Sequence, residues 1–342
     1  MNSMYGQIRH KYFTRLFTLF ILLRISLASV LSQDIHFTLF NNSPLFVNPA
    51  NTGNFEGNWR ITGNYRDQWR AISEPFTTAS VSFEKHFHIY NQTVDAGVYM
   101  INDNSGAIGL TANKFYLSLA YEKSVRKNLF RIGLQAGYAF LAYGGDDLTY
   151  PVDWNHDEGQ FVGSNPSEKS TYPDINIGII WHTAYKILEP ELGISLAHIN
   201  FPNESFFDAK ERLPLRMHLH GSTKIKLLER IYFLPAFIYM NRKSASEMVT
   251  GTNVGFRVFG KRSAVKELTT GIWFRDGFLK NSDAFSITGG ATIGRIDIAL
   301  CYDINISDLK VATGNKGAFE LSFIYRSIST VLNSYSIPCE RY

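Results

Sequence analysis

The 342 residues are enough for one large domain or two smaller ones, and no Pro/Ser/Gly-rich linker divides them. There are 34 Lys and Arg against 30 Asp and Glu, with no basic patch, which argues against a nucleic-acid partner. Cys301 and Cys339 are too few for a disulfide framework, so one bridge and two free thiols are equally open.

Residues 1–32 have the pattern of a cleavable signal peptide. Arg9, Lys11 and Arg15 form a basic start, and an apolar stretch covers 16–31. Val30 and Ser32 are the small residues of a cleavage site before Gln33. A membrane anchor is disfavoured because the stretch is short and contains Arg24. No Cys follows the cut, so we expect no lipoprotein anchor. The leader holds four of the 34 basic residues and no acidic one, so the mature chain from Gln33 is neutral.

From residue 57 the chain repeats about ten alternating residues followed by a turn, which is typical of β-strands. In the first segment the apolar face carries Trp59, Ile61, Gly63, Tyr65 and Trp69, and the polar face carries Arg60, Thr62, Asn64, Arg66 and Gln68. We predict fourteen such strands, starting near 57, 76, 93, 111, 129, 174, 190, 214, 230, 246, 266, 284, 295 and 317. No apolar run of 18 residues follows the leader, so a membrane would have to be crossed by strands.

Two observations favour a membrane barrel over a periplasmic all-β domain. Trp59 and Trp69 would lie about 25 Å apart along the membrane normal, the height of the apolar band of an outer-membrane barrel. With the N-terminus placed in the periplasm, the connections on that side are short, near 91–92, 124–128, 186–189, 229, 261–265 and 294–295. Longer connections lie opposite, at 70–75, 104–110, 143–173, 200–213, 277–283 and 306–316, with one short one near 243–245.

The predicted fold is therefore all-β: a transmembrane antiparallel outer-membrane β-barrel of about 14 strands with a partly filled lumen. After the signal peptide, we expect a lumenal or periplasmic N-terminal segment over 33–56, the barrel over 57–327 and a periplasmic tail over 328–342.

Four short motifs occur in order near the start of the mature chain. They are Gln33-Asp34, Asn48-Pro49-Ala50-Asn51-Thr52-Gly53, Asn64-Tyr65-Arg66-Asp67-Gln68-Trp69 and Thr77-Thr78-Ala79-Ser80. This stretch resembles the PorP/SprF family of Bacteroidota outer-membrane proteins, whose members open with Gln-Asp-Pro, then Asn-Pro-Ala-x-x-Gly and Tyr-Arg-x-Gln-Trp. Ile35 replaces the usual proline.

The resemblance implies a non-enzymatic barrel of the type IX secretion and gliding machinery, without a cofactor. It implies a secreted cargo such as an adhesin with a type B C-terminal domain, held at the surface or helped in its export. Other implied partners are components of the secretion and gliding systems, with lipids and lipopolysaccharide around the barrel. The residues carried over from the family motif are Asn48, Pro49, Ala50, Gly53, Tyr65, Arg66, Gln68 and Trp69.

Physical chemistry suggests roles for these motif residues. Asn48-Pro49-Ala50 with Gly53 suits a tight turn that leads an N-terminal segment out of the lumen. Arg66 and Gln68 would point inward and tie that segment to the wall, while Tyr65 and Trp69 would face the lipid interface. Alternatively, the motif only closes the barrel.

The long connection at 143–173 is the candidate partner-binding loop. Its candidate residues are Asp146, Asp147, Asp153, Trp154, Asp157 and Glu158. Asp153-x-Asn155-x-Asp157 also has the oxygen ligands of a calcium loop, but Glu158 stands where Gly is required and Ser164 where a bidentate Glu is required. A solvated acidic loop is the preferred interpretation.

Two His-x-His pairs, His86/His88 and His218/His220, each place two possible metal ligands on one strand face, without an apparent third. Lumenal or interfacial histidine is the preferred interpretation. No catalytic motif stands out, although a barrel enzyme stays open. The main alternative function is an outer-membrane channel for a small or apolar solute.

Overall fold

The computed structural model describes residues 35–70, 74–89, 92–106, 109–144, 154–155, 160–161, 168–206, 212–243, 245–260, 263–277, 282–308 and 310–328. The chain divides into two units, 1–35 and 36–342, and the fold below is that of the second. The predicted signal peptide and most of the predicted tail lie outside the described residues. None of the described helices is long and apolar enough to span a membrane.

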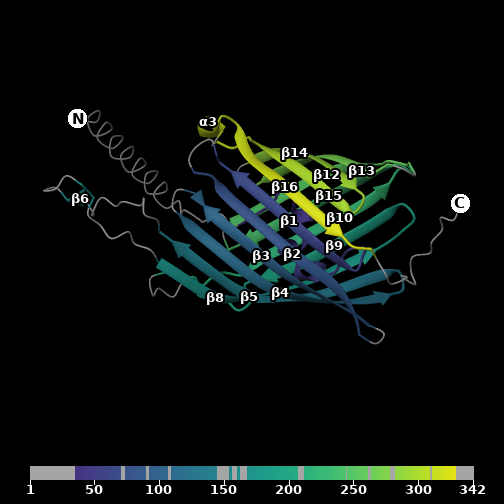
Figure 1. Ribbon diagram of the computed structural model, residues 1–342, viewed down its shortest axis with the longest axis horizontal. Coiled ribbons are helices and arrows are strands. Elements are labelled where there is room, and N and C mark those ends of the chain that lie inside the picture. The colour runs from purple at the N-terminus through teal and green to yellow at the C-terminus, as the bar shows by residue number, and fades with distance from the viewer. Residues whose placement is uncertain are drawn as a thin grey trace, which may run out of the picture. The chain divides into compact units, whose positions relative to one another are not determined.

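Fourteen antiparallel strands close into a barrel in which each strand pairs with its neighbours in the chain and the last pairs with the first (Figure 1). The strands are β1 (Trp59–Gln68), β2 (Phe76–Ile89), β3 (Gln92–Ser105), β4 (Leu110–Val125), β5 (Asn128–Tyr143), β8 (Glu168–Thr183), β9 (Leu188–Ala197), β10 (Arg216–Lys226), β11 (Ile231–Arg242), β12 (Ala245–Arg257), β13 (Val265–Asp276), β14 (Ser282–Ile293), β15 (Ile296–Asn305) and β16 (Lys316–Arg326). The predicted fold class is confirmed. Closure leaves no sheet edge for lipid to meet.

Alternation sorts the side chains between the two faces of the wall. The outward face is apolar; Leu117, Leu119 and Ile132 are each more than half exposed. The inward face is polar and charged, with Glu84 and Glu320 fully buried in the lumen. An apolar outside and a polar inside suit a wall surrounded by lipid.

Short and long connections separate to opposite ends of the barrel, as predicted. The turn at Arg126–Lys127 between β4 and β5 is one of the two-residue connections, while the longest connection joins β5 to β8 and contains the small hairpin of β6 (Trp154–Asn155) and β7 (Gln160–Phe161). The two-residue β11–β12 connection is the one short turn at the long-loop end, as expected near 243–245. Another connection at this end holds helix α3 (Lys310–Thr313). Short turns face the periplasm in such barrels, so we call the end with the short turns periplasmic and the end with the long loops outer.

The predicted start of the sixth strand, near 174, is wrong, and residues 168–173 belong to β8 rather than to the preceding loop. Pro173 lies within β8, although proline lacks the N–H that a strand ladder needs. It is tolerated because β9 pairs only with Ile177–His182 of β8, so no strand lies where the missing N–H would point. Just past the paired stretch, the carbonyl of Ile175 accepts a hydrogen bond from the backbone N–H of Ile199, which lies in the connection after β9 (3.0 Å).

The described parts of the connection from β9 to β10, 198–206 and 212–215, fold into the outer mouth of the barrel. Leu213 is buried against Ala139, Leu141 and Tyr172 on the lumenal side of β5 and β8. The Tyr172 hydroxyl donates to Glu204 of the same connection (3.1 Å). This loop therefore narrows the outer entrance.

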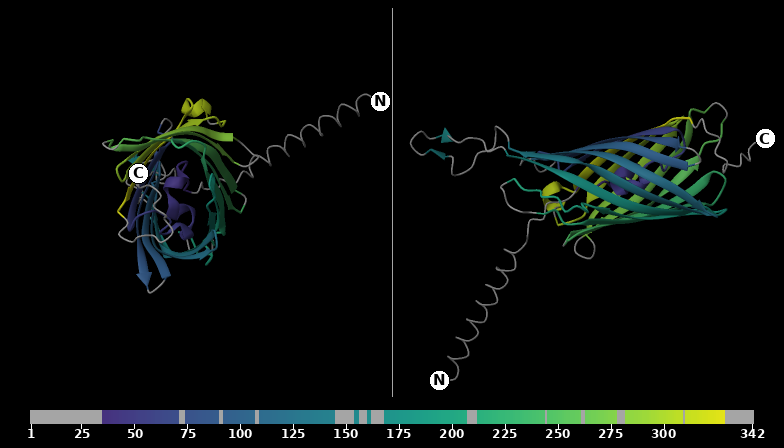
Figure 2. Two further views of the ribbon diagram at one scale, coloured as in Figure 1. Left: turned by 90° about the vertical axis from the view of Figure 1, so that its right-hand side faces the viewer. Right: turned by 90° about the horizontal axis from the view of Figure 1, so that it is seen from below.

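Residues 36–56, here called the plug, lie inside the ring of strands (Figure 2, left). The plug contains three short helices, η1 (Phe40–Asn42), α2 (Pro44–Val47) and η2 (Pro49–Asn51). His36 contacts Arg66 and Glu247, both two residues from the outer ends of their strands. Gly53 contacts Glu84, near the periplasmic end of β2. The plug therefore crosses the lumen once, from the outer mouth to the periplasmic end, before β1 begins. The start of the plug lies at the outer mouth and not in the periplasm, where the N-terminus was predicted, because the plug adds one crossing before the fourteen strands.

Candidate functional site: a plug fixed between two charged clusters

The middle of the plug is fixed by Asn48, the first residue of the family motif. Its side-chain oxygen accepts from the Ala50 N–H (2.9 Å) and caps η2, for which Pro49 supplies the first residue. Its amide nitrogen donates to the carbonyls of Ile179 and Ile194 (3.2 Å each). One side chain thus shapes the turn and also attaches it to β8 and β9.

Glycines in the wall make room for this contact. A Cβ on Gly133 would lie 2.3 Å from the Ala50 nitrogen, and one on Gly178 would lie 1.8 Å from the Asn48 side-chain oxygen. A larger residue at Gly133 would displace the plug backbone, and one at Gly178 would displace the Asn48 side chain. The glycines of β5 and β8 and the Asn48-Pro49-Ala50 turn are therefore complementary surfaces.

The outer end of the plug is held by a buried cluster of Arg66, Arg275, Asp303 and Glu320, which we call the outer cluster. The backbone N–H groups of Thr38 and Leu39 donate to the two Glu320 oxygens (2.7 and 2.8 Å). The two guanidinium groups share Asp303 (3.1 and 2.9 Å). Two positive and two negative charges balance, which makes their burial tolerable.

Arg66 and Glu320 also form an ion pair across the seam of the barrel. They are register partners on β1 and β16, the two strands that close the ring. Arg66 further donates to His36 (3.1 Å) and to the side-chain oxygen of Gln68 (3.1 Å). The family motif residues Arg66 and Gln68 therefore sit where barrel closure and plug attachment meet.

The periplasmic end of the plug is held by Arg60, Glu84, Asp95 and Arg131, which we call the inner cluster. Arg131 donates to the carbonyls of Ala50 (3.0 Å) and Thr52, and pairs with Asp95. Glu84 accepts from the Gly53 N–H (3.0 Å) and from Arg60 through two bonds of 2.9 Å. Both backbone donors and backbone acceptors of the plug are satisfied by charged groups, which make the stronger hydrogen bonds.

Gly53 is required twice over in this cluster. Its φ of +74° lies in the left-handed region that glycine adopts without strain. A Cβ there would also lie 2.2 Å from the carboxyl carbon of Asp95. No other residue satisfies both conditions.

The opposite side of the plug is apolar. Phe40 packs edge-on against Trp273 (ring centroids 5.4 Å apart), and Val47 joins the same buried group with Ile238 and Val249. This side faces β11 to β13. On the periplasmic side of this apolar group, a cavity of about 430 Å³ lies between the plug and the periplasmic halves of the strands from β10 round to β16.

The two histidine pairs are placed differently. His218 and His220 are buried against the plug, where His218 bonds to the Val47 carbonyl (3.0 Å) and His220 to the Asn48 amide (3.0 Å). His86 bonds to Asp95 (2.6 Å), while His88 is exposed. No group of three or more His, Cys, Asp or Glu among the described residues is placed to hold a metal ion.

Tyr65 and Trp69 separate in the structure. Tyr65 is exposed on the outer wall, but β1 ends at Gln68 and Trp69 follows with a φ of +62°. Trp69 packs edge-on against Phe76 (4.8 Å), whose register partner on β1 is the lumenal Gln68. Trp69 is therefore not on the lipid face of β1, against the prediction.

Several candidates fall outside the described residues. They are Asp146, Asp147, Asp153, Asp157, Glu158 and Cys339. Trp154 and Asn155 form β6, of which only the backbone is described. Cys301 is a buried free thiol. The roles of the acidic loop remain predictions.

A closed barrel with an apolar outer wall and a charged lumen is an integral outer-membrane protein. The family model described as "Type IX secretion system membrane protein PorP/SprF" matches residues 29–325, and the chain belongs to this family. A search of curated protein sequences gave no match.

Solved structures resemble the chain in fold alone. The toluene transporters TbuX of Ralstonia pickettii (TM-score 0.47) and TodX of Pseudomonas putida (0.49) are each 10% identical, with 84% of this chain and 94% of theirs covered. A Pseudomonas aeruginosa FadL homologue has a TM-score of 0.46 and 9% identity, covering 83% of this chain and 94% of its own.

Proposed function

We propose that this barrel is a non-enzymatic scaffold of the type IX secretion and gliding system that anchors a secreted surface protein, or helps to export it. Association with type IX secretion follows from the family. The observation that supports a scaffold is the plug, which is attached to the wall at its outer end, its middle and its periplasmic end. Breaking a buried charged pair is costly, so the plug is not a part that leaves easily.

The cargo we propose is a protein with a type B C-terminal secretion domain, such as an adhesin. It would meet the long outer connections, with the acidic stretch 146–158 as the main contact. The periplasmic turns and residues 328–342 would face other components of the secretion and gliding machinery. We assign no chemistry to the barrel.

Deletion of the gene tests the anchoring role. We expect the surface adhesin to be released into the medium or to stay inside the cell, as measured with antibody on intact cells and in culture supernatant. Wild-type barrel restores it. A barrel with Asp146, Asp147, Asp153, Asp157 and Glu158 changed to Asn or Gln should restore it poorly. A barrel with Asp276→Asn at the outer end of β13 and Asp308→Asn on the β15–β16 connection should restore it fully. An adhesin that stays at the surface of the deletion strain would refute the proposal.

The alternative, a channel for a small or apolar solute, is separated by conductance. A scaffold with its plug in place should give no steady current in planar bilayers. Current from wild-type protein would favour transport, with the cavity below the plug as its inner vestibule.

A further inference from the structure

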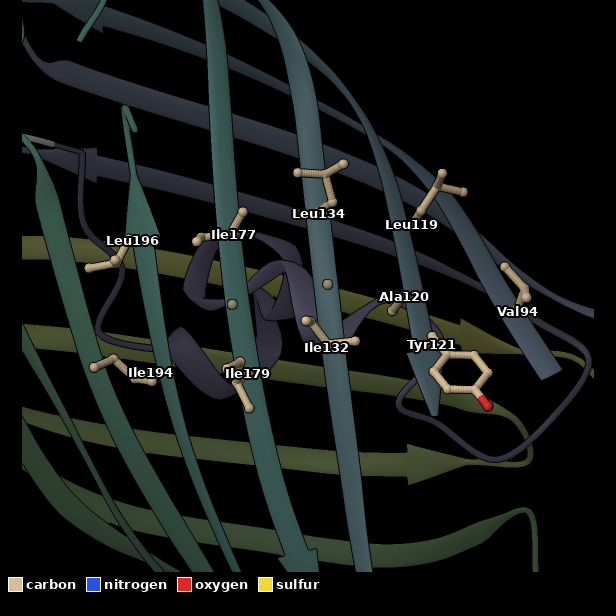
Figure 3. Close-up of a pocket in the computed structure, with 12 residues that line it drawn as sticks. Val94, Leu119, Ala120, Tyr121, Ile132, Leu134, Ile177, Ile179, Ile194 and Leu196 are labelled. Atoms are coloured by element: carbon tan, nitrogen blue, oxygen red, sulfur yellow. The ribbon is translucent and has the colours of Figure 1, made fainter. Parts of the chain in front are cut away.

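A shallow apolar trench crosses the outer wall of the barrel from β3 to β9 (Figure 3), with a volume of about 480 Å³. Its two sides are ladders of register partners. One ladder is Leu119, Leu134, Ile177 and Leu196, and the other, nearer the periplasmic turns, is Tyr121, Ile132, Ile179 and Ile194. Between them run Ala120, Gly133 and Gly178, whose places on the strands face the lumen, so the trench floor is backbone.

The next outward ladder towards the periplasm has a different character. It consists of Lys123, Phe130, Trp181 and Leu192. The Trp181 indole N–H donates to the side-chain oxygen of Asn128 (3.1 Å), which fixes the ring at the level of the strand ends. Aromatic rings with a polar edge are typical of the boundary between head groups and hydrocarbon.

Beyond this ladder, three cationic side chains lie at the periplasmic end of the same part of the wall. We call the trench, the Phe130–Trp181 row and these cations together the sector. Lys123, Arg126 and Lys127 are exposed at the β4–β5 turn, and none pairs with an acidic side chain of the described residues. The neighbouring Glu122 is already paired with Arg131 of the inner cluster. The turn is also tied to the end of β8, because the Thr183 hydroxyl donates to the Lys127 carbonyl (2.9 Å).

We propose that this sector binds one anionic phospholipid of the periplasmic leaflet. Its phosphate would meet Lys123, Arg126 and Lys127, its glycerol region the Phe130–Trp181 row, and one acyl chain the trench. The order of cation, aromatic row and apolar trench along the wall matches the order of groups in such a lipid. Lys123 lies three residues from Ala120 on the trench floor, or about 10 Å along the strand. At a strand tilt near 40° this is about 8 Å along the membrane normal, close to the roughly 5–7 Å of head-group region in one leaflet.

A second copy of this barrel is a poorer occupant. A twofold interface places the same patch on both sides, so three unpaired cations would face three others. A lipid supplies both the negative charge and the flexible apolar chain that the sector lacks. The proposal is independent of the anchoring role.

The test is native mass spectrometry of the purified full-length barrel with added phosphatidylglycerol or phosphatidylcholine of the same acyl composition. We expect wild-type protein to retain one phosphatidylglycerol several-fold better than phosphatidylcholine. The triple change K123Q/R126Q/K127Q should remove this preference. The matched control Arg295→Gln, at the exposed β14–β15 turn, should keep it.

The trench is tested separately from the cations. Ile179→Trp should block it and lower the retention of both lipids several-fold. Ile287→Trp on β14, outside the trench and similarly exposed (49% against 51%), should not. Equal retention of the two lipids by wild-type protein would overturn the proposal. So would equal effects of the two tryptophans, or lipid-free dimers that the triple change abolishes.

Discussion

The two charged clusters hold the same plug but draw on different parts of the chain. The inner cluster uses Arg60, Glu84, Asp95 and Arg131, all within the first five strands. The outer cluster joins Arg66 of β1 to residues of β13, β15 and β16. The inner cluster can therefore assemble once β1 to β5 have paired, whereas the outer cluster needs the closed ring. We infer that the inner cluster positions the plug and the outer cluster couples it to closure.

The largest expected effect is at the seam. Glu320→Ala removes the acceptor of two plug N–H groups and leaves Arg66 with Asp303 as its one acidic partner among the described residues, which should cost about 3–5 kcal/mol. Because Arg66 and Glu320 pair across the seam, the whole barrel should unfold at a lower urea concentration, as measured by tryptophan fluorescence and by heat-dependent migration in gels. A normal barrel with only the plug released would contradict the coupling.

Gly53→Ala should act on the plug and spare the seam. Backbone strain costs roughly 1–3 kcal/mol, and the new methyl group also meets Asp95. We expect faster hydrogen exchange over residues 36–56 with little change in the urea midpoint of the barrel. Gly294→Ala, in a short turn with a φ of +64° and open space around it, is the matched control for strain alone. Equal exchange in the two variants would mean that the Asp95 contact is unimportant.

Asn48→Ala should have the smallest effect of the three, about 1–2 kcal/mol, from loss of the η2 cap and of the bonds to Ile179 and Ile194. Exchange should rise near η2 and leave residues 36–39 protected by the outer cluster. Lys226→Gln, which breaks a partly exposed pair with Glu189, should change stability by less than about 1 kcal/mol. Loss of protection over the whole plug in Asn48→Ala would show that the clusters do not act separately.

Strand positions could be predicted because alternation is a local signal. The predicted starts near 76, 93 and 111 lie within one residue of β2, β3 and β4. The signal failed where a local rule was overridden by distant structure. The predicted sixth strand starts only after Pro173, although proline is harmless there because no partner strand lies on the side of its missing N–H. Trp69 continued the apparent alternation, but the chain had already turned at Gln68.

The site was harder to predict than the wall. The motif drew attention to Asn48, Gly53, Arg66 and Gln68, yet their partners are far away in the chain. Arg131, Asp303 and Glu320 could be seen on polar strand faces, but so could many other residues. Which of them meet depends on the register of fourteen strands and on the path of the plug, and neither is encoded in a short stretch.

The single pass of the plug changes which side of the membrane each end reaches. An even number of strands returns a chain to the side where it entered, but this chain makes one additional crossing through its own lumen. His36 consequently lies at the outer mouth, while Ser327, bonded to Asn58 and Trp59 beside the start of β1, lies at the periplasmic end. A small epitope joined at His36 would be reached by antibody on intact cells, whereas one joined after Ser327 would be reached only after the membrane is opened.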